Sequence, residues 1–387
     1  RMSWLLGGGG LLMMLLHGTM RALPRGVGAV HCRPCRTPER AAIFSAGIDR
    51  MGQMMGNGLS QAGLVRCSAR ADKGDLGTPF GLCLRRDMAT KTPVTPNGHV
   101  SILEDTIRDL FEETFRGQQP VIVDGTLGAG GHAVSILKAL PEAKLYGVDR
   151  DESALSLATK RMVDAGIGED RFVTIKGNYQ DMSTLVPTDR VDGILLDIGV
   201  SSMQLDNPER GFSFRHDGPL DMRMDQSATL TAKKIVNEYP EHVLGEILKE
   251  YGEVRQWRKV AAIICRERAV QEIETTLDLV NVIGPMLNWK KADSHPATKT
   301  FQAIRIAVNS ELRALDVFLS KVGDLLTPGG IVAILSFHPL EDRLVKKAFS
   351  DQRIWKTLSK KPLKPSTEEV AKNPRSRTAK LRVAIRQ

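Results

Sequence analysis

The hydrophobic positions after residue 99 alternate between short apolar runs and segments with helical spacing. Apolar residues recur at helical intervals over Ile102–Phe115 and Ser153–Val163, which predicts two helices. The apolar runs around them are typical of strands: residues 121–123, a run ending at Asp149, Phe172–Lys176 and Val191–Asp197. Because buried parallel strands have continuous apolar runs and alternate with helices, this pattern predicts an α/β fold with a doubly wound, mostly parallel sheet.

The alternation stops after the fourth predicted strand. Leu205–Asp225 is loop-like, and the periodic segments from Thr231 to Leu287 are helical without a convincing strand. The α/β pattern then resumes with one long amphipathic helix from Phe301 to Val322, the strand Ile331–Ser336 and an alternating segment, Lys380–Arg386, that suits an antiparallel edge strand. We therefore predict a helical substrate-recognition subdomain, residues 211–297, inserted into a sheet domain formed by residues 99–210 and 298–387.

The segment between the first two predicted strands carries the most informative chemistry. The first strand ends in the turn Asp124–Thr126, a glycine cluster at Gly128–Gly131 opens a helix, and Asp149 ends the second strand. This spacing fits a dinucleotide-binding unit loosely. Asp124 would repel a diphosphate but suits a ligand with an ammonium and a sulfonium, which favours S-adenosylmethionine as the cofactor. A purely structural glycine turn is the alternative.

Charge is distributed unevenly along the 387 residues, whose formal net charge is +9. Residues 1–91 hold 13 Lys/Arg against 5 Asp/Glu, residues 92–352 hold 30 against 38, and residues 353–387 hold 11 against 2. The chain is therefore an acidic body with two basic ends. No apolar run reaches the ~18 residues that a membrane-spanning helix needs. A Cys32-x-x-Cys35 pair without further ligands does not predict a zinc site, so no metal is expected.

The N-terminal region has the composition of a targeting segment. Residues 1–98 are rich in Arg, Gly, Met and Ala, poor in acids, and end in a Pro/Thr/Gly linker at Thr90–Gly98. Such composition is typical of a mitochondrial presequence, which predicts a disordered leader and a location in the mitochondrial matrix. A secretory signal at Leu5–Leu16 and translated untranslated sequence are the alternatives, the first weakened by four consecutive glycines at Gly7–Gly10.

Several ordered motifs resemble one known family, the ribosomal RNA small-subunit methyltransferase H family. They include DGTLGAGGH at Asp124–His132, GFSFRHDGPLDMRMD at Gly211–Asp225, FQAIRIAVNSEL at Phe301–Leu312 and SFHPLEDRLVK at Ser336–Lys346. The resemblance covers roughly His99 to Arg386, and the N-terminal extension makes the mitochondrial branch, the methyltransferase-like protein 15 group, the closer match. It implies a class I methyltransferase fold and N4-methylation of a cytidine in small-subunit ribosomal RNA with S-adenosylmethionine.

The resemblance also assigns residues to the cofactor. In the family's pattern the cofactor contacts fall on Gly130, Gly131, His132, Asp149, Tyr179, Asp197 and Gln204. Tyr179 stands where relatives carry Phe, and either ring can lie along the adenine. A second departure is Pro339, where many relatives have Ser; it leaves His338 in place and stiffens the turn.

Cytosine N4 is a poor nucleophile, because its lone pair is delocalised into the ring. An enzyme can accelerate methyl transfer by orienting N4 toward the methyl donor. It can also place hydrogen-bond acceptors beside the amino hydrogens. Asp197, at the end of a strand, is the leading acceptor, with cofactor contact alone as its alternative role. Ser201, Ser202 and the segment Asp221–Arg223 are second choices, and His338 is a candidate substrate contact whose alternative is a turn-forming role.

RNA binding needs positive surface, which the basic tail supplies. Lys360, Lys361, Arg375 and Arg377 are its main candidates, and a merely solvated tail is the alternative. Arg210 and Arg223 are among the candidate phosphate contacts, with solvated or internally paired charges as the alternative. Phe212 and Phe214 are candidates for stacking on a flipped base, with core packing the expected fate of at least one.

Three functions stay open on this basis. The first is an N4-cytidine methyltransferase acting on small-subunit ribosomal RNA, free or in an assembling particle, in mitochondria. The second is a methyltransferase of similar fold with a small-molecule or protein substrate. The third is a ribosome-assembly factor whose RNA binding matters more than its chemistry. The basic tail and the large insertion favour a macromolecular substrate.

Overall fold

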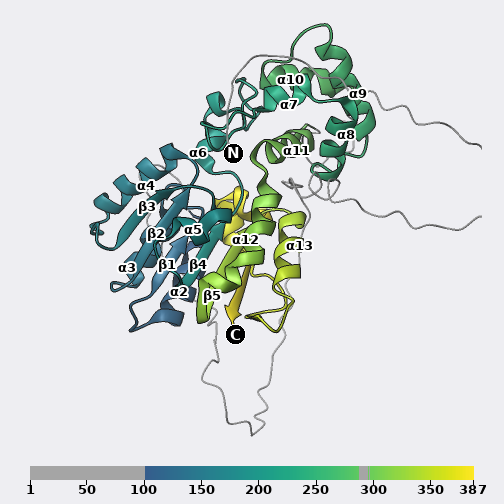
Figure 1. Ribbon diagram of the computed structural model, residues 1–387. Coiled ribbons are helices and arrows are strands. Elements are labelled where there is room, and N and C mark those ends of the chain that lie inside the picture. The colour runs from purple at the N-terminus through teal and green to yellow at the C-terminus, as the bar shows by residue number, and fades with distance from the viewer. Residues whose placement is uncertain (1–100, 287–294, 296) are drawn as a thin grey trace, which may run out of the picture.

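The computed structural model describes residues 101–286, 295 and 297–387 of the chain (Figure 1). The predicted leader, residues 1–98, and with it the predicted presequence, lies outside the described residues. A sheet with helices on both faces forms one part of the structure, and a group of helices forms the other. No helix among the described residues is long and apolar enough to span a bilayer.

The sheet has seven strands in the order β3-β2-β1-β4-β5-β7-β6. The strands are β1 (Val121–Asp124), β2 (Lys144–Asp149), β3 (Phe172–Lys176), β4 (Val191–Asp197), β5 (Leu326–Ser336), β6 (Trp355–Thr357) and β7 (Lys380–Arg386). The strands β1 to β5 are parallel to one another, and β7 pairs antiparallel with both β5 and β6. This order, with one reversed strand beside β5, confirms the predicted doubly wound sheet and is that of class I methyltransferases.

The predicted edge position of Lys380–Arg386 is wrong, although its antiparallel direction is confirmed. β7 lies between β5 and the short strand β6, which forms the edge. The alternating pattern that suggested an edge arises because one set of β7 residues, among them Leu381 and Val383, packs on a single face of the sheet. Strand β6 is only three residues long, too short to stand out as a hydrophobic pattern.

Alternate residues of the strands supply two apolar cores. Ile331, Ala333 and Leu335 of β5 pack on one face, whereas Val332 and Ile334 pack on the other. The first face is covered by α2 (Glu104–Phe115), α3 (Gly131–Ala139) and α4 (Glu152–Asp164), and the second by α5 (Met182–Leu185), α12 (Glu311–Leu325) and α13 (Pro339–Ala348). Both faces of the parallel strands are therefore buried, which explains their unbroken apolar runs.

The helical subdomain has a third core of its own. It is formed by α7 (Ala232–Glu238), α8 (Glu241–Glu250), α9 (Trp257–Arg268), α10 (Thr276–Ile283) and α11 (Thr298–Asn309). Phe301, Ile304 and Val308 of α11 pack in this core, so α11 belongs with the helical subdomain rather than with the sheet. The structural unit extends to Asn309, beyond the boundary expected near residue 297.

The single long helix expected from Phe301 to Val322 is wrong. The chain forms α11 and α12 with a break at Ser310, whose backbone is left-handed with φ 50° and ψ 37°. The apolar spacing on each side of Ser310 is helical, so periodicity alone does not reveal the break. Across it, Arg305 and Glu311 form a buried bidentate ion pair, with Nε–Oε1 and Nη2–Oε2 distances of 2.8 Å. The break thus separates the two cores while this ion pair holds the helices together.

The helical subdomain stands over the edge at which the parallel strands end (Figure 1). The short helix α6 (Ser202–Asp206) follows β4 directly at this edge, and the chain returns through α11 and α12. In an open α/β sheet, ligands bind at the carboxyl ends of the strands. The subdomain therefore lies where it can contact a substrate held beside the cofactor.

Candidate active site

Three aspartates end three neighbouring strands at this edge. Asp124 ends β1, Asp149 ends β2 and Asp197 ends β4, and β1 lies between the other two strands. The carboxylates of Asp149 and Asp197 both raise the pKa of Asp124, so the three groups are close enough to interact. The loop after β1 joins them, because the Thr126 hydroxyl accepts a hydrogen bond of 2.5 Å from the Asp197 amide.

Asp124 is the most deeply buried of these acids. Its residue is 2% exposed, and its Oδ1 accepts one hydrogen bond of 3.1 Å from the Thr126 amide. Burial raises the pKa of its carboxyl to about 7, against the lowering effect of His132. A buried carboxylate without a close cation is costly, and an ammonium or sulfonium placed beside it would relieve that cost.

His132 lies in the first turn of α3 and is also buried. Its Nδ1 has no hydrogen-bond partner in the structure, and its Nε2 lies 3.5 Å from Asp197 Oδ2, which is long for a hydrogen bond. Burial lowers the pKa of the imidazole, but the carboxylates of Asp197 and Asp124 outweigh it and leave the pKa above its ordinary value. An orphaned buried imidazole beside two acids is the mark of a site that a polar ligand completes.

Asp149 is held by the backbone of its surroundings. Its Oδ2 accepts from the Gly128 amide at 2.8 Å and its Oδ1 from the Asp151 amide at 2.9 Å. Gly128 and Gly130 have positive φ values of 51° and 75°, and a side chain at Gly130 would come within 3.1 Å of the Ala158 Cβ. Glycine is thus required at Gly130 both for conformation and for packing against α4.

These residues fit S-adenosylmethionine. A buried acid and an unpartnered imidazole suit a ligand with positive and polar groups, the Gly130–Gly131 turn opens α3, and Asp149 is a hydrogen-bond acceptor for ribose hydroxyls. In that arrangement Asp124 would face the positive charge of the ligand. The assignments of Gly130, Gly131, His132, Asp149 and Asp197 to individual cofactor atoms stay predictions.

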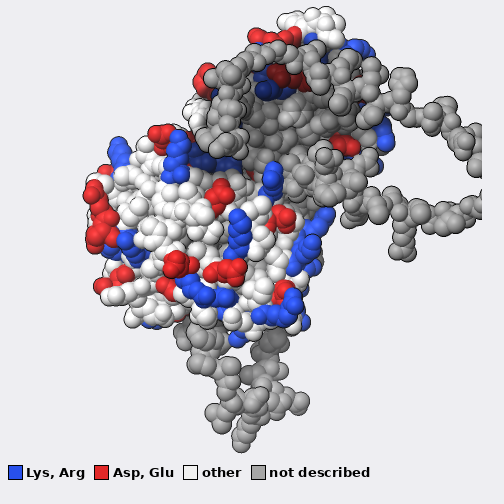
Figure 2. Space-filling view, in the orientation of Figure 1, with Lys and Arg blue, Asp and Glu red and all other residues white. Residues whose placement is uncertain are grey.

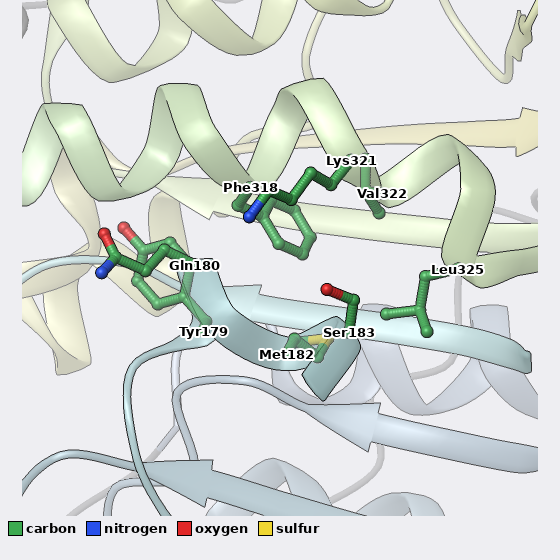
Figure 3. Close-up of a pocket in the computed structure, with 8 residues that line it drawn as sticks. All are labelled: Tyr179, Gln180, Met182, Ser183, Phe318, Lys321, Val322 and Leu325. Atoms are coloured by element: carbon green, nitrogen blue, oxygen red, sulfur yellow. The ribbon is translucent and has the colours of Figure 1, made fainter. Parts of the chain in front are cut away.

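Tyr179 opens a short 3₁₀ turn (Tyr179–Asp181) after β3 and packs against α12. Its hydroxyl donates to the Glu311 carbonyl at 3.4 Å, and its ring meets Phe318 edge to face at 5.8 Å between centroids. A small pocket opens between this turn and α12, lined by Tyr179, Gln180, Met182, Ser183, Phe318, Lys321, Val322 and Leu325 (Figure 3). The pocket borders the predicted site only at Tyr179, and none of the three strand-end acids lines it.

Ser201, Ser202 and Gln204 belong to the start of α6. Ser201 caps the helix, its hydroxyl accepting from the Gln204 amide while Gln204 Oε1 accepts from the Ser201 amide. Gln204 also donates to Asp151 Oδ2 at 3.1 Å. Ser201 and Gln204 therefore fix the chain at the exit of β4. The predicted contacts of all three residues with substrate or cofactor stay predictions.

His338 is not placed to contact a substrate. It is 1% exposed, it caps α13 through Nδ1, which accepts from the Glu341 amide, and its Nε2 lies 3.0 Å from Glu341 Oε1. Pro339 begins the helix, as expected of a stiff turn. The turn-forming role, which was the alternative, is the one the structure has.

Three further candidates belong to the helical subdomain, of which Phe212 is buried and Phe214 and Arg223 are partly exposed. Phe212 is 7% exposed and packs in the subdomain core, so it does not offer a face to a base. Phe214 packs edge to face on Phe301, with 4.8 Å between ring centroids. Arg223 pairs with Asp221 at 2.6 Å and donates to the carbonyls of Gln226 and Ala228. Arg223 is therefore held by a salt bridge within its loop, which was the alternative to a phosphate contact.

The basic tail is folded, and of its candidates Arg375 reaches the active-site edge of the sheet through its contact with α6. β6 runs in the same direction as β5, because β7 is antiparallel to both, and Thr357 at its end pairs with Ala384 opposite Val332 of β5. Lys360 and Lys361 follow on the outer side of β7, before Leu363 pairs with Leu381. Both lysines are exposed. Arg375 pairs with Asp206 of α6 at 2.5 Å, and Arg377 is half-buried. On the face in Figure 2, basic and acidic side chains are interspersed over the sheet domain, without one dominant basic patch.

Two buried residues join the site to the helical subdomain: Arg210, for which an internally paired charge was the alternative to a phosphate contact, and Asn309, which sequence reasoning missed. Arg210 Nη1 lies 2.8 Å from Asp151 Oδ2, and the Asn309 side chain bonds to the backbone of Met222 and Met224. Their polar side chains sit in otherwise apolar or loop-like motifs, which is the only signal the sequence carries. Among the described residues, no three His, Cys, Asp or Glu side chains are grouped so that they could hold a metal ion.

The sequence matches a known protein family and named members of it. The model of the MraW methylase family matches residues 96–387. The chain is 44% identical over 303 residues to the ribosomal RNA small subunit methyltransferase H of Sorangium cellulosum, covering 76% of this chain and 93% of that protein. It is 46% identical over 264 residues to the protein of the same name from Picosynechococcus, covering 68% and 88%.

Among solved structures, a putative rRNA-methylase from Clostridium thermocellum matches with a TM-score of 0.38 and 12% identity, covering 75% of this chain and 100% of that one. The family match spans the whole described structure, including the helical subdomain and the folded tail. This chain is therefore a methyltransferase of the MraW methylase family.

Proposed function

We propose that this enzyme transfers a methyl group from S-adenosylmethionine to N4 of a cytidine in small-subunit ribosomal RNA. The observation that carries the proposal is the meeting of Asp124, Asp149, Asp197 and His132 at one strand edge beneath the helical subdomain. Relatives that share more than 40% of their residues with this chain are named small-subunit ribosomal RNA methyltransferases, which supports the same substrate class here.

The chain's own residues account for binding. When bound, S-adenosylmethionine supplies the methyl group, and its positive charge offsets the cost of burying Asp124. Asp149 accepts hydrogen bonds from the ribose hydroxyls. The Gly130–Gly131 turn directs the amides at the start of α3 toward the ligand's carboxylate.

We assign Asp197 the role of proton acceptor. It ends β4, keeps 28% of its side chain exposed, and its backbone is fixed by Thr126. A carboxylate at this position accepts a hydrogen bond from the cytosine amino group and takes the proton that N4 loses. His132, whose Nε2 lies 3.5 Å from Asp197 Oδ2, is the nearest basic side chain to this carboxylate in the proposed site.

The tail supplies RNA contacts. Lys360 and Lys361 are exposed on the outer side of β7, where they are available to phosphate groups of an RNA that extends from Asp197 across β5 and β7. Arg375, paired with Asp206, and the half-buried Arg377 are weaker candidates.

We further propose that the enzyme acts in the mitochondrial matrix and supports assembly of the small ribosomal subunit there. The Arg-rich, acid-poor composition of residues 1–98 supports the location, and the large helical subdomain suits a substrate larger than free nucleoside. Closeness to the mitochondrial branch stays a prediction, because the relatives compared above are bacterial.

The test measures N4-methylcytidine in small-subunit ribosomal RNA from mitochondria of cells with and without the protein. Loss of this nucleoside, restored by the wild-type chain and not by Asp197→Asn, is the expected result. Unchanged N4-methylcytidine would contradict the proposed activity. If Asp197→Asn restored normal ribosome levels without restoring the methyl group, RNA binding alone would account for the assembly role.

A further inference from the structure

The end of β2 is connected to the helical subdomain through two buried side chains. Three consecutive residues leave β2: Asp149, which faces the proposed cofactor, and then Arg150 and Asp151. Arg150 Nη1 donates to the Asn309 carbonyl at 3.0 Å, and Asp151 Oδ2 receives Arg210 Nη1 at 2.8 Å. Both contacts lead to residues that hold the same short segment of the subdomain, Met222–Met224.

Arg210 and Asn309 hold Met222–Met224 from two sides. Arg210 Nη2 donates to the carbonyls of Arg223 and Met224 at 2.9 and 3.1 Å. Asn309 Oδ1 accepts from the Met224 amide at 2.8 Å, and its Nδ2 donates to the Met222 carbonyl at 2.7 Å. The two remaining amides of the segment donate to the Arg210 carbonyl and to Asp221 Oδ1.

Every backbone polar group of Met222–Met224 is thus satisfied without a partner strand or helix. Met222 is fully buried and has a left-handed backbone with φ 60°, which few non-glycine residues adopt. Met222 and Met224 pack in the core of the helical subdomain. A segment held in this way moves with its two clamps, so a change at the end of β2 reaches the subdomain core.

Both clamps are buried, and one of them, Arg210, forms an ion pair with Asp151 after β2. Arg210 and Asn309 are each 7% exposed, and Asp151 is 3% exposed. Burial raises the pKa of Asp151, but hydrogen bonds from Ser153, Gln204 and Arg210 outweigh it, so the carboxylate stays ionised. A buried arginine fork between a carboxylate and two carbonyls has a fixed geometry that a lysine does not reproduce.

We propose that Arg210, with Asn309, is a positioning residue that couples cofactor binding at Asp149 to the placement of the helical substrate-recognition subdomain. Ligand bound at Asp149 restricts the motion of the residues that follow it. Arg150 and Asp151 contact Asn309 and Arg210, and through them restrict the motion of Met222–Met224. Cofactor binding then raises the affinity of the subdomain for RNA. By thermodynamic linkage, bound RNA raises the affinity for the cofactor by the same factor. The coupling rests on the proposed function, since it needs the cofactor to bind at Asp149.

The first test uses the full chain and S-adenosylhomocysteine, followed by amide hydrogen exchange. In the wild type the ligand is expected to slow exchange of the Met222–Met224 amides by about fivefold or more, at the lower end of typical coupling. In Arg210→Gln the ligand is expected to protect the Gly128–Gly131 loop but to change exchange at Met222–Met224 by less than about twofold. Equal protection of Met222–Met224 in both proteins would overturn the proposal.

Matched variants separate coupling from folding and from charge. Arg215→Gln removes an exposed arginine of the same loop and is expected to behave as the wild type. Asn309→Leu keeps the Asp151–Arg210 pair and removes the second clamp, so it should abolish the coupling even if Arg210→Gln unfolds. If Asn309→Leu retained wild-type protection, Met222–Met224 would not be the link.

The second test compares the dissociation constant of small-subunit ribosomal RNA with and without S-adenosylhomocysteine. We expect a difference of about fivefold or more in the wild type and near none in Arg210→Gln. Arg210→Lys should recover thermal stability but not the difference. A wild type that does not bind S-adenosylhomocysteine would overturn the proposed function itself, whereas one that binds it without any effect on Met222–Met224 would overturn only the coupling.

Discussion

Asp124 is 2% exposed at the end of β1, and burial raises the pKa of its carboxyl to about 7. In the unfolded chain the pKa is near its ordinary value of 3.8, so the folded state binds this proton more tightly. The stability that protonation contributes is fully present below about pH 3.8 and is lost as the pH rises through 7. At neutral pH and above, the ligand-free enzyme therefore has an unfavourable charge in its active site.

This pH linkage gives the first prediction, for Asp124→Asn without ligand. The variant has no carboxylate to ionise, so its free energy of unfolding should rise relative to the wild type between pH 5 and pH 8. The gain is at most about 4 kcal/mol, since one pKa unit corresponds to about 1.4 kcal/mol. Urea unfolding at several pH values measures it, and a wild-type-to-variant difference that does not change with pH would contradict the assignment.

The second prediction concerns Asp149→Ala. Loss of the carboxylate that faces the ribose should weaken S-adenosylmethionine binding by about tenfold or more, about 1.4 kcal/mol or above, measured by titration calorimetry. Asp192→Ala is the control: Asp192 lies at the other end of the sheet, where its carboxylate bonds to the Val121 amide and the Thr327 hydroxyl. Equal affinity of Asp149→Ala and wild type would remove Asp149 from the cofactor site.

Residue by residue, the sequence predicts the acids better than the groups around them. Asp124, Asp149 and Asp197 follow apolar runs directly, and adjacent parallel strands bring such positions together. Arg210 and Asn309 are not predictable in this way, because Asn309 meets Met224 across 85 residues of chain. The burial of His338 and Phe212 also depends on tertiary packing rather than on the local pattern.

At the scale of elements, the break between α11 and α12 is the main departure from the periodic pattern. The buried pair of Arg305 and Glu311 spans it, with side chains 4% and 9% exposed. Hydrophobic spacing continues through Ser310 and therefore predicts one helix. What breaks the helix is that α11 and α12 serve different cores. The parallel strands that flank the site agree with their predicted positions because burial on both faces gives each of them an unbroken apolar run.

The third prediction tests this connection. Glu311→Gln removes a carboxylate that pairs with the buried Arg305 and should lower the free energy of unfolding by up to about 3–5 kcal/mol. Arg305→Met with Glu311→Leu removes both charges and should recover most of that loss. Chemical denaturation measures all three, with Arg353→Gln, which breaks the exposed pair with Asp351, as a control of smaller effect. A double variant as unstable as the single one would contradict the ion-pair account.

At the scale of the whole molecule, part of the tail's positive charge lies at the edge where the substrate is proposed to bind, because Arg375 pairs there with Asp206 of α6. The strand order alone brings it there: β7 begins at the edge where β5 ends, with Ser336 paired to Lys380. The sequence predicts that the tail is basic and that an insertion lies after the fourth strand. It does not predict that both converge on one edge, because this depends on the placement of β7 between β5 and β6.

The fourth prediction follows from this placement. Lys360→Gln with Lys361→Gln should weaken binding of small-subunit ribosomal RNA and reduce the slope of log affinity against log salt by about 1 for each phosphate that the two side chains no longer neutralise. Lys138→Gln is the control, since this exposed lysine ends α3, which runs back from the active-site edge. An unchanged salt slope in the double variant would mean that these lysines stay in solvent and do not contact the RNA.

The insertion between β4 and β5 also has a consequence for how the chain folds. Asp192 and the Thr327 hydroxyl are hydrogen-bonded although 135 residues separate them, so pairing β4 with β5 requires closing a long loop. The helices of the subdomain make mostly local contacts and can form first, which shortens that loop in effect. A subdomain that folds early would bring β4 and β5 together, and mutations that weaken its core should then slow the closing of the sheet, even though they lie outside it.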